Sequence, residues 1–102
     1  MHDFLKKSRR QEKRRAERSG GRRTPGSGNG IRKNDVRTDE FSFECKFTTK
    51  RSYTLRLDDL LKAEKNALLE GRTMVFEVNI AGHTYMIMTE ADWEERIGVH
   101  GE

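Results

Sequence analysis

Two carboxylates and a lysine stand at spacings that could form a metal-dependent hydrolytic site. Asp35 is followed by Glu44, and Lys46 stands two residues further on. The segment FSFECKFT around Glu44 alternates apolar and polar residues, which is typical of a half-buried strand. Glu44 and Lys46 then share the face opposite the phenylalanines. If Asp35 returns beside them, the group can hold a hard divalent cation and activate a water next to a phosphodiester.

The elements that must position these residues follow from local patterns. Residues 34–38 and 40–48 are expected to form an antiparallel hairpin that turns near Thr38–Asp39. A helix over about 57–70 should follow. The chain should then form strands over 73–80 and 83–88 and a last helix capped by Thr89. Gly71 is expected to end the middle helix in the left-handed conformation. Ala81–Gly82 is expected to turn the second pair of strands into a hairpin.

The apolar positions predict which faces of these elements are buried. One helical stripe should carry Leu57, Leu60, Leu61, Ala63, Ala67 and Leu68. Tyr85 and Trp93 are expected in the core, with Ile97 one turn after Trp93 on the inner side of the last helix.

The chain of 102 residues predicts a single domain with two parts. Residues 1–32 form a basic segment: a helix over 3–19 with little apolar face, and then a flexible Gly/Ser loop. Residues 33–98 form a compact core of sheet and helices. The fold class is therefore α/β (α+β), a mixed sheet flanked by helices in the order α-ββ-α-ββ-α.

Charge divides the chain unevenly and points to a polyanionic partner. Residues 1–37 contain thirteen Lys/Arg and four Asp/Glu, whereas residues 38–102 contain eight and thirteen. The balances of +9 and −5 account for the net charge of +4. A basic first third suits nucleic acid. A solvated basic tail is the equally weighted alternative.

Several classes of site and location are excluded or disfavoured. The single cysteine, Cys45, allows no intramolecular disulfide and fits a reducing cytoplasm. The three histidines have no metal-ligand spacing, and a zinc site lacks its cysteines. The GSG loop lacks the lysine of a P-loop, so no nucleotide cofactor is expected. No apolar run approaches a membrane span, so no membrane partner is expected.

The order of elements and four short segments resemble the restriction-endonuclease-like (PDDEXK) superfamily. The segments are SRRQE, GGRRTPGSG, RKNDVR and FECK, and the likeness extends from about Ser8 to Trp93. Within the superfamily the chain is most similar to small archaeal Holliday-junction resolvases and to resolvase-like endonucleases of bacteriophages. The resemblance implies a nuclease fold with one metal site.

Carried over residue by residue, the resemblance implies a role for each matching position. Asp35, Glu44 and the backbone carbonyl of Cys45 would ligate Mg²⁺ or Mn²⁺, Glu12 would complete the site from the first helix, Lys46 would orient the attacking water, and Ser27 would lie near the scissile phosphate. The flanking Arg22, Arg23, Arg32 and Lys33 suit contacts with the DNA backbone.

Two departures from the family pattern bear on these roles. Asn34 stands where the family has a proline before the metal-binding aspartate. The first helix is short of apolar residues, so Glu17 is an alternative to Glu12.

The resemblance implies a Mg²⁺-dependent endonuclease that resolves four-way DNA junctions by paired nicks, acting as a homodimer. Two alternatives stay open: another nicking or repair nuclease of the superfamily, and an inactive DNA-binding protein of the same fold. The dimer surface is not readable, although the N-terminal helix and the second hairpin are candidates.

Overall fold

The computed structural model describes residues 2–20, 22–23 and 35–98. Its elements are α1 (His2–Ser19), β1 (Arg22–Arg23), β2 (Asp35–Arg37), β3 (Phe41–Thr48), α2 (Leu57–Leu69), β4 (Thr73–Ile80), β5 (His83–Ile87) and α3 (Glu90–Ile97). The mixed α/β class and the expected order of helices and strand pairs are confirmed, and the two-residue β1 is added at one edge. No helix among the described residues is long and apolar enough to cross a membrane.

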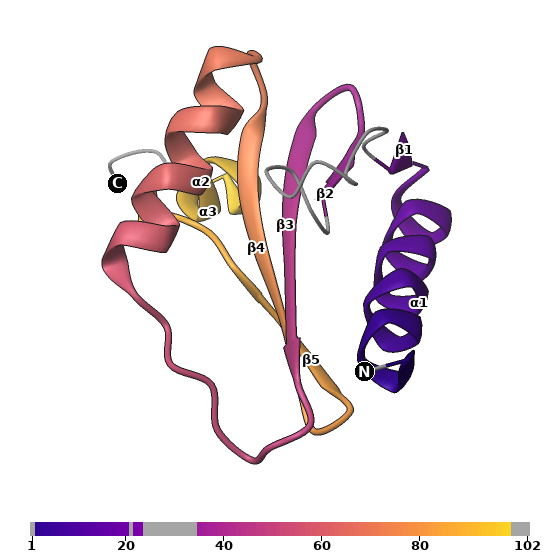
Figure 1. Cartoon of the computed structure of the whole chain (residues 1–102). Coiled ribbons are helices and arrows are strands. Elements are labelled where there is room, and N and C mark those ends of the chain that lie inside the picture. Colours follow the sequence, from indigo (N-terminus) through magenta and orange to yellow (C-terminus); the bar gives the residue numbers. More distant parts are fainter. Residues whose placement is uncertain (1, 21, 24–34, 99–102) are drawn as a thin grey trace.

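The strands form one mixed sheet in the order β1-β2-β3-β4-β5. β3 and β4 are parallel, and the other neighbouring pairs are antiparallel. Parallel neighbours need a long crossover, which α2 provides. Figure 1 shows α1 on one side of the sheet and α2 on the other. The sheet therefore has a face toward each helix, called here the α1 face and the α2 face.

The α2 face is packed by apolar side chains. Ala63 and Ala67 of α2 are buried with the strand residues Met74, Phe76 and Val78. The two alanines let the helix approach the sheet closely, and Phe76 is fully buried beneath it. This cluster is a conventional hydrophobic core, in which buried apolar area supplies the stability.

The α1 face combines apolar and polar burial. Val36, Phe43, Cys45 and Val75 are buried there, and Ala16 of α1 packs against them. Glu77 lies on the same face, because it is two residues from Val75 along β4. Its side chain is fully buried, and Gln11 of α1 is only 8% exposed. The basic helix is therefore packed on the sheet and is part of the same compact unit.

Local residue choices explain where the elements end. Gly71 has φ +70°, the left-handed conformation that commonly follows a helix. Ala81 and Gly82 both have positive φ, as a two-residue turn between antiparallel strands requires. The side chain of Thr89 accepts a hydrogen bond from the backbone N–H of Asp92, so the predicted cap of α3 is confirmed.

The predicted core positions were partly wrong. Tyr85 is 57% exposed, Trp93 is 53% exposed and Ile97 is 49% exposed. Tyr85 lies on β5, an edge strand, and α3 is attached through Arg96, which pairs with Glu40 and stacks on Phe41. On α2, the contact with the sheet is made by the alanines and Leu60, whereas Leu57, Leu61 and Leu68 are exposed.

Candidate metal and phosphodiester site

The β2–β3 register brings the two predicted acidic positions together. Asp35 is the direct cross-strand partner of Glu44. Directly opposed residues of an antiparallel pair belong to the same face of the sheet, with Cβ atoms about 4.5–5.5 Å apart. For Asp35 the structure describes the backbone position only. That position is the one a two-carboxylate cation site requires.

Glu44 and Lys46 form an ion pair on the α2 face. The distance from Lys46 Nζ to Glu44 Oε2 is 3.4 Å, and the side chains are 36% and 25% exposed. The pair is therefore open to solvent and to a ligand. Arg37 is close enough to Glu44 for that carboxylate to help raise its pKa, although a hydrogen bond to Glu70 is the main cause. Glu44 thus has two cations near it, Lys46 in direct contact and Arg37, which is itself paired with Glu70.

The backbone carbonyl of Cys45 is turned toward β2. Thr73 N, at the start of β4, donates to Glu40 O, and Thr38 N, beside β2, donates to Phe41 O. Because carbonyl direction alternates along a strand, the even-numbered residues of β3 turn their carbonyls to β4 and the odd-numbered ones to β2. The Cys45 carbonyl is therefore on the side where β2 begins. The backbone of Asp35, the Glu44 side chain and the Cys45 carbonyl are thus neighbours in the sheet, and carboxylate and carbonyl oxygens are the ligands that Mg²⁺ prefers.

The Cys45 thiol is not suited to be a ligand or nucleophile. The side chain is fully buried on the α1 face. Burial raises the pKa of the thiol strongly, and the charge of Glu77 raises it further, while Arg15 lowers it. Because the thiolate is the reactive form, this thiol is inert near neutral pH. Only the backbone of Cys45 can take part in the site.

The two glutamates proposed on the first helix occupy opposite sides of α1. Glu12 is half-buried in the half of α1 that faces the sheet, whereas Glu17 is exposed. Glu12 and Glu44 both act on the pKa of Cys45, so they approach the same part of β3 from its two faces. Of the two glutamates only Glu12 faces the sheet, and it does so from the α1 face, opposite the face that carries Glu44 and Lys46. Its participation in a metal site remains a prediction.

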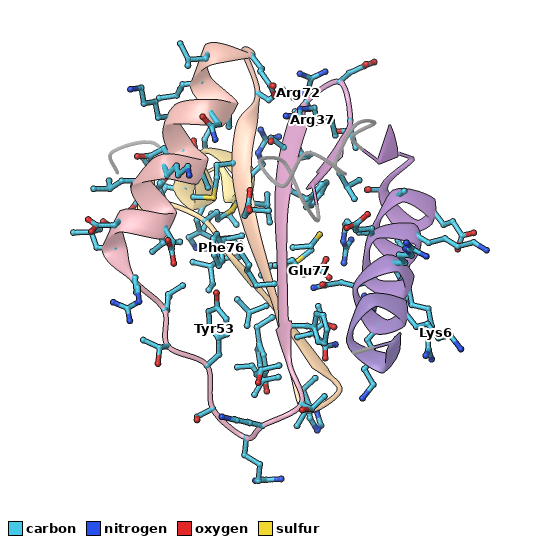
Figure 2. All side chains as sticks on the ribbon, viewed as in Figure 1. Lys6, Arg37, Tyr53, Arg72, Phe76 and Glu77 are labelled. Carbon is cyan, nitrogen blue, oxygen red and sulfur yellow. The ribbon has the colours of Figure 1, made fainter. Side chains whose placement is uncertain are left out.

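Tyr53 borders the site on the α2 face. Its half-buried ring packs against the core cluster of that face. Figure 2 places it on the segment between β3 and α2. Burial raises the pKa of its phenol, Lys46 lowers it, and Asp59 and Glu44 raise it. The phenol is thus within electrostatic reach of the ion pair.

A buried polar network on the α1 face was not predicted from the sequence. Gln11 Nε2 donates to Lys46 O at 2.8 Å and to Glu77 Oε2 at 3.1 Å, and Arg15 Nε pairs with Glu77 Oε1 at 2.5 Å. Figure 2 shows Glu77 pointing from β4 toward α1. The network joins the helix carrying Glu12 to the backbone of the strand carrying Lys46. Its only signals in the sequence were a glutamate inside the apolar run of β4 and polar residues on the inner side of α1.

The remaining predicted residues are not placed by the structure. Ser27, Arg32 and Lys33 lie outside the described residues, and for Arg22 and Arg23 only the backbone of β1 is described. Within the described part of the chain, no three His, Cys, Asp or Glu side chains are grouped closely enough to hold a metal ion. The predicted set has three carboxylates, those of Asp35, Glu44 and Glu12, and one carbonyl, and the side chain of Asp35 lies outside the described part of the chain.

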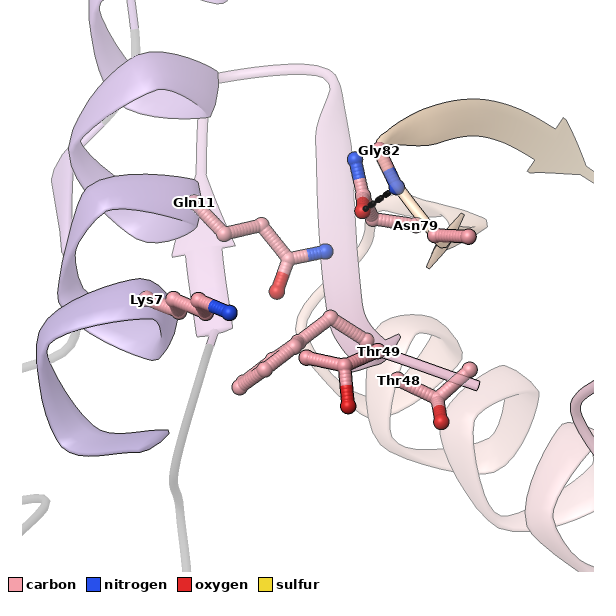
Figure 3. Close-up of a pocket in the computed structure, with 8 residues that line it drawn as sticks. Lys7, Gln11, Thr48, Thr49, Asn79 and Gly82 are labelled. Carbon is pink, nitrogen blue, oxygen red and sulfur yellow. Dashed lines mark hydrogen bonds between the residues drawn. The ribbon is translucent and has the colours of Figure 1, made fainter. Parts of the chain in front are cut away.

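A cavity of about 390 Å³ opens on the other side of the molecule, between α1 and the carboxyl ends of β3 and β4. Figure 3 shows Lys7 and Gln11 reaching toward Thr48 and Thr49, while Asn79 accepts a hydrogen bond from Gly82 N at 3.1 Å. Its lining contains a lysine and neutral residues, with no carboxylate. The cavity therefore does not suit a hard cation.

Comparison with family models, curated proteins and solved structures finds no match to this chain.

Proposed function

We propose that this protein is a metal-dependent endonuclease that cuts branched DNA, with a four-way junction as its substrate. The observation that supports this best is the register that pairs Asp35 with Glu44, beside the Cys45 carbonyl and the Glu44–Lys46 ion pair. The likeness of the four sequence segments to the PDDEXK superfamily gives this arrangement its chemical interpretation.

The proposed site uses each group for a separate task. Asp35, Glu44 and the Cys45 carbonyl would hold Mg²⁺ or Mn²⁺, which when bound stabilises the charge that develops on the phosphate. Lys46 donates hydrogen bonds to the attacking water or to a phosphate oxygen. Water attacks phosphorus in line, and the bond to the leaving oxygen breaks as the new P–O bond forms.

A homodimer is part of the proposal, because paired nicks on a two-fold symmetric junction need two sites. Exposed apolar side chains on the edge strand β5, Tyr85 and Met86, favour the second hairpin as the dimer surface. The α1 residues that the structure describes as exposed are all charged, which makes the other candidate surface less suited to a dimer.

The direct test is a gel assay with a labelled four-way junction and a linear duplex of matched sequence. Wild-type protein is expected to nick the junction symmetrically with Mg²⁺ or Mn²⁺ and not with EDTA. Asp35→Asn and Glu44→Gln should lose cleavage by at least about a hundredfold, while junction binding is retained. Glu95→Gln is the matched control, because Glu95 is exposed on α3, and it should cut normally.

Other outcomes assign the protein differently. Junction binding without cleavage in either metal would mean an inactive DNA-binding protein. Equal cutting of junction and linear duplex would mean a nuclease without junction specificity. Glu12→Gln tests the helix residue separately, and a loss of cleavage there, with Glu17→Gln unaffected, is expected.

A further inference from the structure

The outer face of α1 is a dense row of positive charge. Among the α1 side chains that the structure describes, the exposed residues of this face, called here the α1 basic face, are Lys6, Arg9, Arg10, Lys13, Arg14 and Arg18, together with the acidic Glu17. Figure 2 shows Lys6 pointing away from the sheet. Within the described part of the chain, no ion pair or hydrogen bond holds any of the six cations. Six exposed cations beside one exposed carboxylate leave a large excess of positive charge, which points to an anionic partner.

The orientation of this face is fixed from the other side of the helix. Arg15 and Gln11 are held by the fully buried Glu77, and Ala16 packs against the apolar cluster of the α1 face. A helix anchored by three inward residues cannot roll about its axis. The six cations of the α1 basic face therefore stay directed away from the sheet, whereas Lys7 lines the cavity between α1 and the strand ends.

The composition and length of the face favour the phosphate backbone of DNA over other anions. From Lys6 to Arg18 every side chain described as exposed is charged, whereas a helix that enters a membrane interface needs an apolar face. From Lys6 to Arg18 the helix rises about 18 Å, at 1.5 Å per residue. That length spans about five base-pair steps at 3.4 Å each, too long for one small anion and suited to a strand of phosphates.

The α1 basic face and the cleavage site lie on opposite sides of the sheet. Glu44 and Lys46 belong to the α2 face, whereas α1 covers the face of Phe43 and Cys45. A helix with its side chains is about 10–12 Å thick. A straight duplex lying against Glu44 would therefore need to cross the thickness of the sheet and of α1 to reach the outer cations.

We propose that the α1 basic face binds the backbone of a second DNA segment, distinct from the segment that is cut. The inference rests on the proposed function. One protomer would select branched DNA by binding the cut segment at the Glu44–Lys46 site and a second segment at the α1 basic face. A junction supplies two segments at a fixed angle, and a linear duplex supplies one.

The test measures DNA binding without cleavage, in EDTA, using a fluorescent four-way junction and a linear duplex with the sequence of one arm. The triple variant Arg10→Ala/Lys13→Ala/Arg14→Ala should bind the junction at least about tenfold more weakly at 200 mM salt. Three lost phosphate contacts should reduce the slope of log K against log salt by about 2.7, at about 0.9 for each contact. Duplex binding should change less than about twofold.

A matched control removes exposed cations elsewhere. Lys62→Ala/Lys65→Ala on α2 should leave both affinities unchanged. Far-UV circular dichroism of the triple variant should match that of wild type, because all three positions are exposed.

An unchanged junction affinity in the triple variant would overturn the inference, and so would an equal loss for junction and duplex. A triple variant that loses binding only to phosphatidylserine vesicles would assign the face to a membrane and also overturn it. The proposed function has its own contradicting result, which is wild-type protein that binds junctions and never cuts them. Even then, the junction affinities of wild type and the triple variant could still be compared, so the two failures can be told apart.

Discussion

The two faces of the sheet hold their helices by different means. α2 is attached mainly by apolar contacts, with Ala63 and Ala67 over Phe76. α1 is attached by Gln11 and Arg15 to the buried carboxylate of Glu77, with Ala16 beside them. Neighbouring residues of one strand, Phe76 and Glu77, are thus the centres of two different kinds of core. A helix that is almost wholly charged can dock on a sheet when the sheet provides a buried counter-charge.

The polar attachment also links regions that the proposed function needs. Gln11 bonds both Glu77 and the backbone of Lys46, and Glu12 is its neighbour on α1. The apolar attachment of α2 has no such link. The α1 side therefore combines stability with the positioning of the site, whereas the α2 side mainly supplies stability.

The largest effect should come from removing the buried counter-charge. Glu77→Ala leaves Arg15 and Gln11 facing an apolar sheet and should cost about 3–5 kcal/mol of unfolding free energy. Phe76→Ala on the other face should cost a similar amount, through lost burial and the cavity it creates. Urea unfolding measures both changes.

Hydrogen exchange then separates these two variants. Glu77→Ala should speed hydrogen exchange of the α1 amides. The α2 amides should stay protected up to the limit set by the free energy of global unfolding. Phe76→Ala should do the reverse. The same exchange pattern in both variants would contradict the difference between the two attachments. In the double variant Arg15→Met/Glu77→Leu, stability should return toward that of wild type.

A smaller loss of unfolding free energy is expected from breaking an ion pair on the α2 side. Arg37 Nε donates to Glu70 Oε1 at 2.7 Å, between β2 and the end of α2. The hydrogen bond from Arg37 holds the pKa of Glu70 below its ordinary value. The pair is partly exposed, so Glu70→Gln should cost only about 0.2–1 kcal/mol at pH 7.

The pH dependence of this contribution has a definite sign. A lowered folded pKa means that the contribution is full above the unfolded pKa of about 4.3 and is lost as pH falls through the lower folded value. The stability gap between wild type and Glu70→Gln should therefore close in acid. Urea midpoints at pH 7 and at about pH 3 measure the gap. A gap that widens in acid would show that Arg37 does not stabilise the carboxylate.

The smallest effect is expected from the outward leucines of α2. Leu68 is 70% exposed, so Leu68→Ala should change the unfolding free energy of the monomer by less than about 0.5 kcal/mol. Ala67→Leu, one residue away and fully buried in contact with the sheet, should cost about 1–3 kcal/mol through overpacking. A large loss in Leu68→Ala that depends on protein concentration would instead place Leu68 in a dimer interface.

Most of the fold followed from local patterns in the sequence. The alternation of FSFECKFT and TMVFEVNI predicted β3 and β4, and the positions of Thr38, Gly71 and Thr89 predicted where elements turn or end. What the patterns did not reveal was which side chains another element would cover. Trp93 and Tyr85 are apolar enough for a core, but they lie on α3 and on an edge strand, where none of the described residues buries them.

The candidate site was predicted in part. The spacing of Asp35 and Glu44 required a particular hairpin register, and the structure has that register. The role of Glu77 was missed because alternation alone cannot tell a solvated face from one covered by a polar helix. Gln11 and Arg15 look like ordinary residues of a basic helix until their buried partner is known.

The proposed metal site is tested most directly by measuring Mn²⁺ binding by electron paramagnetic resonance, with an uncleavable phosphorothioate junction present. Wild-type protein is expected to bind at least one more ion per chain than Glu44→Gln or Asp35→Asn, and Glu95→Gln should match wild type. Because the ligands are proposed to be the two carboxylates and the Cys45 carbonyl, Cys45→Ala should also retain the ion. If Glu44→Gln and Asp35→Asn bound as many Mn²⁺ ions as wild type, the claim that these two carboxylates hold the cation would be contradicted.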